Sequence, residues 1–522
     1  MRRTSTSIAA LVAAAMLALA ACGGGGGGSA DDTKAASQDV DRSGTLKVAM
    51  NYPPYPLDPH KAASTQASFP FTTLVYDNLT RMGPDLELEP MLATKWEFSD
   101  DNKSVTFTLR DDVTFSDGEK LDANAVKLSM DRAMNLPDST VAVFFPMVES
   151  VEVVDALNVK FNTNRSAADL PYVLSGAEGG IVSPAAVDNE DLDVKPVGSG
   201  AYVLDKFTTG QNASFNRRED YWDKEAAPAK RIEMTGIVSN ATRINAMRSG
   251  QYDMSVNKLD QAKQLDALPE KFTTTYYRPA VTYAFIFNTG SDKVNDLKVR
   301  QALNYAVDRE AINASLLGGK CEPTTQPLPE VYEGHLEESP VDYSYDPKKA
   351  KDLLAEAGVS SGLKLTAVVG ANISPETTIA ETLQAQFKEV GVDLEVRELA
   401  GAQLYPAWAE GAADGFVSVK PTQPNGAMTL ANQYLNKARF PGKTPAEFDD
   451  AVNKAYDPQL SDEERVATLE AASTIAVEQA FDVNICALPT VIAASDKVVG
   501  ADKMGRSSFV GIPDLRYVGV TG

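Results

Sequence analysis

Histidine and cysteine are scarce in this chain, with two histidines and three cysteines among 522 residues. The histidines, His60 and His335, lie far apart, and no two cysteines form a CxxC pair. Metal and redox centres in proteins usually need several such side chains at short spacing. We therefore expect no metal site and no cofactor.

The common enzyme motifs are also missing. There is no GxGxxG after a predicted strand, no GxxxxGK[ST] loop, no HExxH and no GxSxG. Carboxylate pairs such as Asp100-Asp101 and Asp111-Asp112 stand in turn-like, solvated settings, which give no reason to expect a general acid or base. The sequence therefore predicts a protein that is not an enzyme, with an exported hydrolase as the enzymatic alternative.

Positive charge is in deficit. Lysine and arginine number 49 against 72 aspartates and glutamates, so the formal net charge at pH 7 is −23. A nucleic-acid phosphate backbone binds to a basic surface. The composition therefore excludes nucleic acid as a partner and says little about any small ligand.

Long apolar runs are absent except near the N-terminus, where Ile8 to Leu19 follows Arg2 and Arg3. This run is too short for an ordinary membrane span and has the length of a signal-peptide core. We expect residues 1–21 to be a cleaved export signal. The folded part should then lie outside the cytoplasmic membrane.

The end of this signal, Leu19-Ala20-Ala21-Cys22, resembles the bacterial lipobox, whose cysteine becomes the lipidated first residue of the mature protein. A plain signal with an incidental cysteine is the alternative. Residues 22–44 are rich in glycine and polar residues, which predicts a flexible tether. Lipid on Cys22 would anchor the protein to the outer face of the cytoplasmic membrane.

With Cys22 lipidated, Cys321 and Cys486 remain as a pair. Disulfides persist in exported proteins, so a bridge between these two cysteines is the favoured prediction. Two buried, unreactive thiols are the alternative.

The stretch Trp96 to Met134 has the clearest local pattern. Val105, Phe107 and Leu109 alternate with threonines, as in a half-buried strand. A turn at Ser116-Asp117-Gly118 follows, and Asp122 then caps a helix with one apolar stripe. Its residue pattern, Trp-x(13)-Arg-x(4)-Phe-Ser-Asp-Gly, closely resembles the signature of the family 5 extracellular solute-binding proteins. These proteins are the oligopeptide, dipeptide and nickel receptors of ABC importers.

Further matches extend this resemblance over about residues 45–522. They include Glu89-Pro90-Met91-Leu92-Ala93, the turn Pro196 to Tyr202, Arg217 to Trp222, and the helix Leu297 to Val307 after Asp296. In the second half of the chain, helices with clear caps at Asp346-Pro347 and at Ser461 with Glu464 flank a predicted strand–helix–strand unit from Leu363 to Val396. Such a unit predicts a parallel sheet covered by helices.

The resemblance implies an α/β fold of the two-lobed periplasmic-binding-protein type II, with doubly wound sheets and an extra α+β subdomain. We expect lobe one to comprise residues 45–79, 196–281 and 490–522, and the inserted subdomain residues 80–195. Lobe two comprises residues 282–489. A ligand would lie where the lobes meet, because domain interfaces and the carboxyl ends of parallel strands are preferred pockets.

Two segments contain the candidate ligand contacts, because the corresponding segments of the family face the two sides of the ligand cleft. One follows the first strand and the other follows a glycine-plus-Asp turn at Asp414. The candidates are Asn51, Tyr52, Tyr55, Lys420, Gln423 and Asn425. Amides would orient the ligand, Lys420 could pair with an anion, and tyrosines could stack on it. Tyrosines in the core and polar residues on the surface are the alternative.

The expected function is therefore an exported, monomeric receptor that captures a peptide-like or other organic solute and delivers it to an ABC permease and ATPase. Peptide receptors of this family commonly hold the ligand's α-ammonium with an Asp in Asp-Tyr-x-Asp-Pro, whereas this chain has Lys420 to Asn425 there. We expect a solute that is neutral or anionic at this end, with free-amine peptides as the alternative. A sensory or adhesive lipoprotein with the same fold also remains open.

Overall fold

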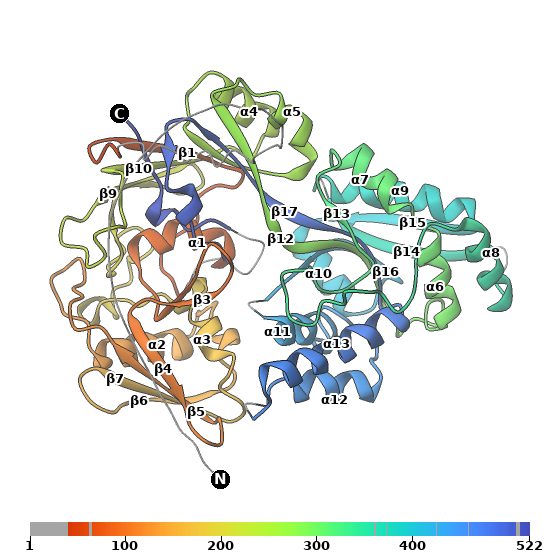
Figure 1. Cartoon of the computed structure of the whole chain (residues 1–522), viewed down its shortest axis with the longest axis horizontal. Coiled ribbons are helices and arrows are strands. Elements are labelled where there is room, and N and C mark those ends of the chain that lie inside the picture. Colours follow the sequence, from red (N-terminus) through yellow and green to blue (C-terminus); the bar gives the residue numbers. More distant parts are fainter. Residues whose placement is uncertain are drawn as a thin grey trace, which may run out of the picture. The chain divides into compact units, whose positions relative to one another are not determined.

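One sheet of eleven strands is the framework of the protein (Figure 1). The computed structural model describes residues 40–61, 65–359, 362–371, 373–423, 425–457, 459–507 and 512–522. Ten strands follow the order β15-β14-β16-β12-β17-β11-β1-β10-β9-β8, and β13 (Glu322–Pro323) pairs with β17. The signal peptide, Cys22 and most of the tether predicted from the sequence lie outside the described residues.

Two long antiparallel strands connect lobe one to lobe two. They are β12 (Phe272–Phe287) and β17 (Asp482–Ser495), paired from Phe272 opposite Ser495 to Ile286 opposite Asp482. The lobe boundaries expected at 281/282 and 489/490 fall inside these strands. The register of the pair shifts between Tyr277 and Val281, next to the first boundary. The lobes therefore share one continuous sheet.

In lobe one, β1 (Thr45–Met50) runs parallel to β10 (Arg231–Gly236) and β11 (Met254–Asn257). Antiparallel strands β9 (Asn212–Arg217) and β8 (Tyr202–Thr208) complete this side of the sheet. Helices α1 (Thr65–Val75), α4 (Asn240–Arg248) and α5 (Ala262–Asp266) accompany them. The strand β1 ends where the candidate segment beginning at Asn51 starts.

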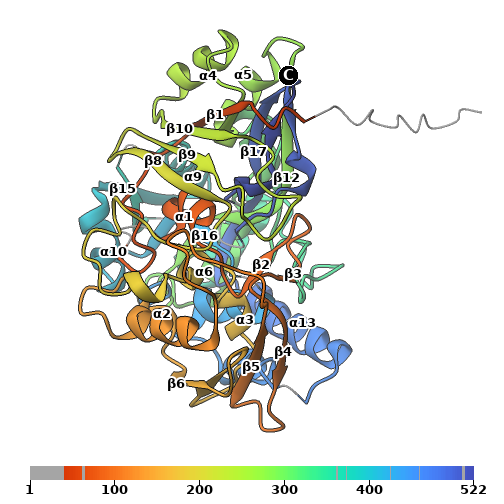
Figure 2. The same cartoon turned by 90° about the vertical axis from the view of Figure 1, so that its left-hand side faces the viewer.

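The inserted subdomain has its own antiparallel sheet, in the order β4-β5-β7-β6, which lies apart from β8, β9 and β10 (Figure 2). Its strands are β4 (Ala93–Phe98), β5 (Ser104–Leu109), β6 (Val148–Val153) and β7 (Asn158–Thr163). Its helices are α2 (Ala123–Asn135) and α3 (Leu170–Val173), and the hairpin β2 (Thr80–Met82) and β3 (Leu88–Pro90) leads into it.

The local predictions for this subdomain are confirmed. Val105, Phe107 and Leu109 lie in β5 and are buried. Asp122 caps α2 and accepts a 2.8 Å hydrogen bond from the backbone N–H of Ala125. The apolar face of α2 packs on the same core as Phe107.

The strand–helix–strand unit predicted in lobe two is also confirmed. β14 (Leu363–Gly370) runs parallel to β15 (Val392–Leu399), with α9 (Glu376–Glu389) between them in the chain. β14 also runs parallel to β16 (Gly415–Pro421), which pairs antiparallel with β12. The carboxyl end of β16 therefore points to the segment that holds the second group of candidate residues.

Helices cover both faces of this part of the sheet. One core contains buried residues of α6 (Leu297–Tyr305), α7 (Arg309–Leu316), α8 (Pro347–Glu356) and α9. A second core lies on the other face, where Figure 1 shows α11 and α13. Its elements are α10 (Gly401–Ala409), α11 (Gly426–Leu430), a π-helical turn (Ala431–Leu435), α12 (Ala446–Lys454) and α13 (Asp462–Glu478).

The chain near the C-terminus forms a turn before its last short strand. Residues Leu515–Tyr517 form a 3₁₀ turn, and only β19 (Gly519–Val520) is a strand, paired with β18 (Val498–Val499). The side chain of Arg516 forms ion pairs with Asp77 and Asp514 inside the core. This buried cation therefore lies in the turn, just before the last strand.

Among the described residues, no helix combines the length and the apolar character that a bilayer crossing requires.

Candidate functional site

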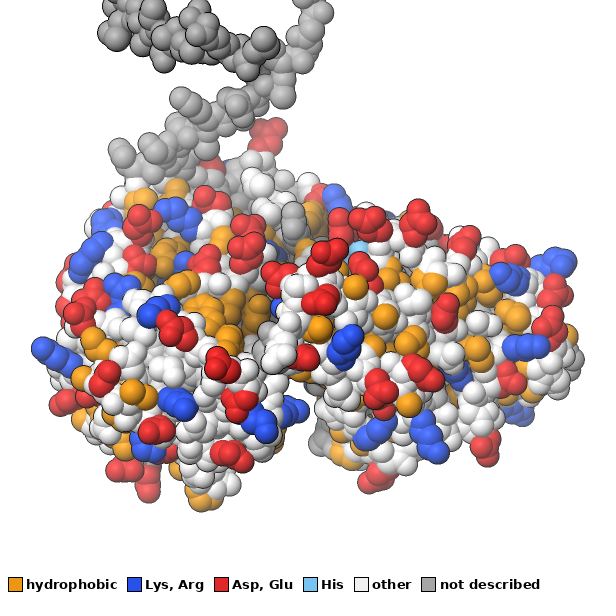
Figure 3. Space-filling model, turned by 60° about the horizontal axis from the view of Figure 1, so that its bottom comes forward, with side chains coloured by type: hydrophobic (Ala, Val, Ile, Leu, Met, Phe, Trp, Pro, Cys, Tyr) orange, Lys and Arg blue, Asp and Glu red, His pale blue; other side chains and the backbone are white. Residues whose placement is uncertain are grey.

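A cavity lies between the inserted subdomain and lobe two, and we call it the interlobe cavity. Its volume is about 1370 Å³, above the roughly 300–1,000 Å³ that is common for small-molecule sites. Figure 3 shows the surface deeply hollowed between its two halves. The lining includes Asp101 to Lys103, α3, Gln423, the π-helical turn and Tyr456. A peptide-sized organic molecule can therefore fit here.

Two polar contacts cross the cavity from lobe two to Asp169 of the inserted subdomain. Asn425 caps α11 by accepting a 2.8 Å hydrogen bond from the backbone N–H of Met428. Its amide nitrogen donates a 3.2 Å hydrogen bond to a carboxylate oxygen of Asp169. The side chain of Tyr456 bonds to the same carboxylate. Together these groups hold the two walls in contact.

The carboxyl group of Asp169, in the cavity wall, has a raised pKa. Burial raises the pKa of Asp169 to about 6, and the hydrogen bond from Asn425 and the charge of Arg165 act against this increase. At neutral pH Asp169 is therefore mostly ionised, yet it is a poorly solvated anion. Such an anion can attract a cationic group of a ligand.

Polar atoms without partners also face this region. The amide nitrogen of Asn432, in the π-helical turn, is buried and has no hydrogen-bond partner among the described residues. Burying an amide without a partner costs about 1–3 kcal/mol. A ligand that accepts this hydrogen bond would remove the cost.

One of the six predicted contact residues lines this cavity. It is Gln423, whose backbone N–H is bonded to the hydroxyl of Thr429 at 2.8 Å. Asn425 is not part of the lining, but it contacts the lining residue Asp169. Both Gln423 and Asn425 follow the carboxyl end of β16.

Lys420 has a different environment. Its side chain is 2% exposed and forms an ion pair with Asp482, and Tyr434 also bonds to the Lys420 ammonium. Burial lowers the pKa of Lys420, while Asp482 acts to raise it. The positive charge expected to face an anionic ligand is thus compensated inside lobe two, by a partner 62 residues away in the chain.

The other three candidates, Asn51, Tyr52 and Tyr55, are half-buried in lobe one and do not line the interlobe cavity. The carbonyl of Pro54, between them, accepts a 3.1 Å hydrogen bond from Gly210. The side-chain oxygens of Asn51 and Tyr52 are buried without a partner among the described residues. Burial raises the pKa of Tyr52 far above its usual value, so this phenol stays neutral.

Sequence reasoning missed Asp169, Asn432 and Tyr456. Asp169 lies 256 residues from Asn425 in the chain, and no local pattern connects the two. The available signal was indirect, because Asn425-Gly426 begins a helix directly after a strand. A helix start at that place positions the next turn, with Asn432, beside the cavity.

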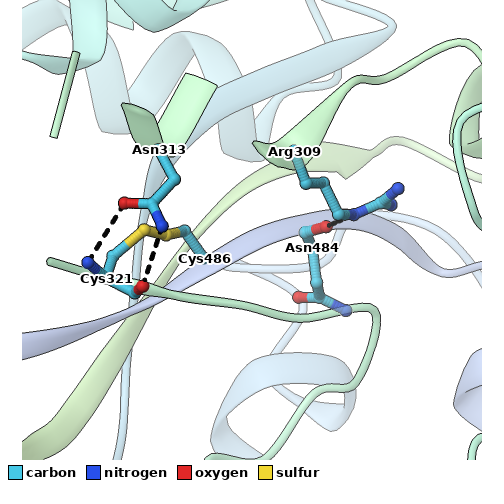
Figure 4. Close-up of a disulfide and its surroundings, with 5 residues drawn as sticks. All are labelled: Arg309, Asn313, Cys321, Asn484 and Cys486. Carbon is cyan, nitrogen blue, oxygen red and sulfur yellow. Dashed lines mark hydrogen bonds between the residues drawn. A yellow bond between two sulfur atoms is a disulfide. The ribbon is translucent and has the colours of Figure 1, made fainter. Parts of the chain in front are cut away.

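The structure joins Cys321 to Cys486, with Cα atoms 5.9 Å apart. Figure 4 shows Asn313 beside the bridge, donating to the carbonyl of Cys321 at 3.0 Å and accepting from its N–H at 3.2 Å. Nearby, Arg309 donates a 2.6 Å hydrogen bond to the carbonyl of Asn484. The bridge ties β17 to the chain that follows α7.

In the described ranges, no three side chains of histidine, cysteine, aspartate or glutamate gather in a way that could hold a metal ion.

Comparisons with known proteins agree with this architecture. The glutathione-binding protein GsiB of Pectobacterium atrosepticum is 26% identical over 474 residues, covering 88% of this chain and 90% of that protein. The heme-binding protein A of Haemophilus influenzae is 29% identical, covering 82% of this chain and 84% of its own. The crystal structure of NikA from Brucella suis in complex with Fe(III)-EDTA has a TM-score of 0.81 at 23% identity, covering 91% of this chain and all of that one.

A family model matches the central part of the chain. Residues 87–454 match the bacterial extracellular solute-binding proteins, family 5, which is well over half of the chain. The region includes most of the inserted subdomain, most of the lining of the interlobe cavity and most of lobe two. The chain belongs to the bacterial extracellular solute-binding proteins of family 5 and is a solute-binding receptor of an ABC importer.

Proposed function

We propose that this receptor binds an organic solute in the interlobe cavity, and that the solute is neutral or anionic where it meets lobe two. One observation carries the proposal. The segment from Lys420 to Asn425 brings Gln423 into the cavity lining and Asn425 against Asp169 of the opposite wall, and it contains no acid. A desolvated ammonium needs a fixed opposite charge, whereas a carbonyl or carboxylate is satisfied by amide donors.

The named ligands of two relatives support this chemistry. Glutathione and heme, which appear in the names of the relatives from Pectobacterium atrosepticum and Haemophilus influenzae, each carry two carboxylates, and glutathione also carries one ammonium group. An acidic organic solute therefore fits the cavity of this chain. The protein would enclose it between the lobes and pass it to the permease without chemical change.

Free-amine peptides remain the second candidate because of Asp169. Its carboxylate faces lobe two and contacts Asn425, so it could pair with an α-ammonium from the opposite wall. One solved relative, a dipeptide-binding protein from a Pseudoalteromonas species, is in complex with Met-Leu. An acid from the inserted subdomain would then replace the one that lobe two lacks.

A thermal-shift panel separates the two candidates. It should compare free di- to pentapeptides, their N-acetylated forms, sugars and organic acids. A bound solute stabilises the protein by RT ln(1 + [L]/Kd), about 2.7 kcal/mol at a hundredfold excess over Kd. We expect N-acetylated or acidic compounds to raise the melting temperature. Stabilisation by free-amine peptides that disappears on N-acetylation would contradict the proposal.

We further infer that the mature protein begins at a lipidated Cys22 and acts as a monomer tethered to the outer face of the cytoplasmic membrane. This rests on the lipobox-like Leu19 to Cys22 and on the glycine-rich residues after it. Mass spectrometry of the native N-terminal peptide should find a lipid-modified Cys22. An unmodified N-terminus at another residue would contradict the anchor.

A further inference from the structure

A second, smaller pocket opens beside the interlobe cavity, and we call it the aromatic pocket. Its volume is about 200 Å³, and its lining includes Tyr405, Trp408, Phe416, Gln433 and Arg439. Arg439 lines the interlobe cavity as well. A ligand held in the larger cavity can therefore place one end in the smaller one.

The aromatic pocket is built to take one apolar group. The rings of Tyr405 and Trp408 lie 6.0 and 5.5 Å from the ring of Phe416, centroid to centroid. Trp408 is 1% exposed, whereas Tyr405 is 56% exposed and faces solvent in part. A cavity of about 150 Å³ holds benzene in another protein. One aromatic ring or a branched alkyl group is thus the size that fits.

Arg439 is a cation without a counter-ion. The indole N–H of Trp408 donates a 2.8 Å hydrogen bond to the carbonyl of Arg439, which fixes this residue beside the aromatic rings. In the part of the chain that is described, the guanidinium of Arg439 takes part in no ion pair or hydrogen bond. Burial lowers the pKa of Arg439, although the guanidinium stays charged at neutral pH.

The side-chain amide of Gln433 gives a second reason, apart from Arg439, to expect a polar ligand group in the aromatic pocket. It is 5% exposed and lines the aromatic pocket, and both its amide oxygen and its amide nitrogen lack partners among the described residues. It belongs to the π-helical turn, a conformation that occurs often at functional sites. An unpaired buried amide is costly, so a ligand with polar atoms near its apolar group would satisfy it.

Lys420 also lines the aromatic pocket, but its charge is already paired with Asp482. Arg439 is therefore the cation in this pocket that remains available to an anion. Arginine suits this role because its planar guanidinium binds a carboxylate through two parallel hydrogen bonds.

We propose that the solute is an amphipathic organic acid whose carboxylate binds Arg439 and whose aromatic or branched apolar group fills the aromatic pocket. This inference rests on the proposed function and names the class of solute. Polar atoms beside the apolar group bond to Gln433. Arg439 then selects for the negative charge, and the three aromatic side chains select for the apolar group.

Calorimetric titration with three probes tests this assignment. They are N-acetyl-L-phenylalanine, its amide, which lacks the negative charge, and N-acetylglycine, which lacks the ring. The natural protein should bind the acid about 10- to 100-fold more tightly than the amide, the range expected for a charge-assisted bidentate pair. It should also prefer N-acetyl-L-phenylalanine to N-acetylglycine.

Two variants and a control assign these preferences to residues. Arg439→Gln should remove the preference for the acid over the amide and keep the preference for the ring. Tyr405→Ala should reduce the preference for the ring. Arg397→Gln is the matched control, because Arg397 is exposed on β15 and paired with Glu395. It should change neither ratio, and thermal melts should show that all three variants fold.

Three results would overturn the inference. The natural protein could bind the acid and the amide equally, or it could fail to bind the acid. The preference for the acid could also survive in Arg439→Gln. The failure of the proposed function is distinguishable from these outcomes. A solute from the wider panel that binds the natural protein and Arg439→Gln equally would preserve the receptor function and refute the role of Arg439. A panel without any binder would refute both.

Discussion

Replacing Lys420 with methionine should lower the free energy of unfolding by about 3–5 kcal/mol, the cost of leaving one charge of a buried ion pair without its partner. Asp482 would then face an apolar core with only Tyr434, whose hydroxyl donates to it at 2.6 Å, as a side-chain partner. One oxygen of Asp482 has no hydrogen-bond partner among the described residues. Urea unfolding monitored by tryptophan fluorescence measures the change, because Trp408 lies in the same core.

Lys348→Met provides the matched control for this prediction. Lys348 pairs with Asp352 on the outside of α8, and both side chains are exposed. Such a surface pair contributes about 0–1 kcal/mol. Adding Asp482→Asn to Lys420→Met should recover part of the loss, because it removes the uncompensated charge. Equal, small effects of Lys420→Met and Lys348→Met would show that the buried pair carries little free energy.

Local elements of the fold were predictable because their signals lie within a few residues of each other. Asp346 caps α8, and Gly358 follows its end with a positive φ of 77°. Ser461 and Glu464 form the predicted capping box at the start of α13. In each case the residue that begins or ends the helix stands within a few residues of the backbone groups at that helix end.

The joining of the lobes was harder to predict. The apolar run from Tyr283 to Asn288 predicts a short strand, yet it is the end of the 16-residue strand β12. The polar threonines and tyrosines that precede it gave no sign that the strand continues into lobe one. Pairing with β17 stabilises this stretch, and β17 lies about two hundred residues further along the chain.

The charge environment of Lys420 was also hard to predict, because it depends on residues far away in the chain. Lys420 lies in β16, but its partner Asp482 belongs to another strand, β17. A lysine beside a ligand and a lysine paired in a core have the same local sequence. Only the pairing of β16 and β17 with β12 shows which of the two this lysine is.

Removing the Cys321–Cys486 bridge should also lower the free energy of unfolding by a large amount. The bridge joins residues separated by 165 positions, so it closes most of lobe two into one loop. The chain-entropy model gives roughly 5 kcal/mol for a loop of this length at 25 °C, as an upper figure. The double variant Cys321→Ala, Cys486→Ala should therefore unfold at a markedly lower urea concentration than the natural chain.

Reductant provides the internal control for this prediction. Both cysteines are buried, so dithiothreitol should reach the bridge only when the protein unfolds. When the natural chain is refolded in dithiothreitol, its free energy of unfolding should fall towards that of the double variant. The free energy of unfolding of the double variant should not change with dithiothreitol. In a background with Cys22 replaced by serine, thiol labelling of the unfolded, unreduced chain should find no free cysteine. Two labelled thiols, or no effect of reductant, would contradict the bridge and would assign the stability of lobe two to packing alone.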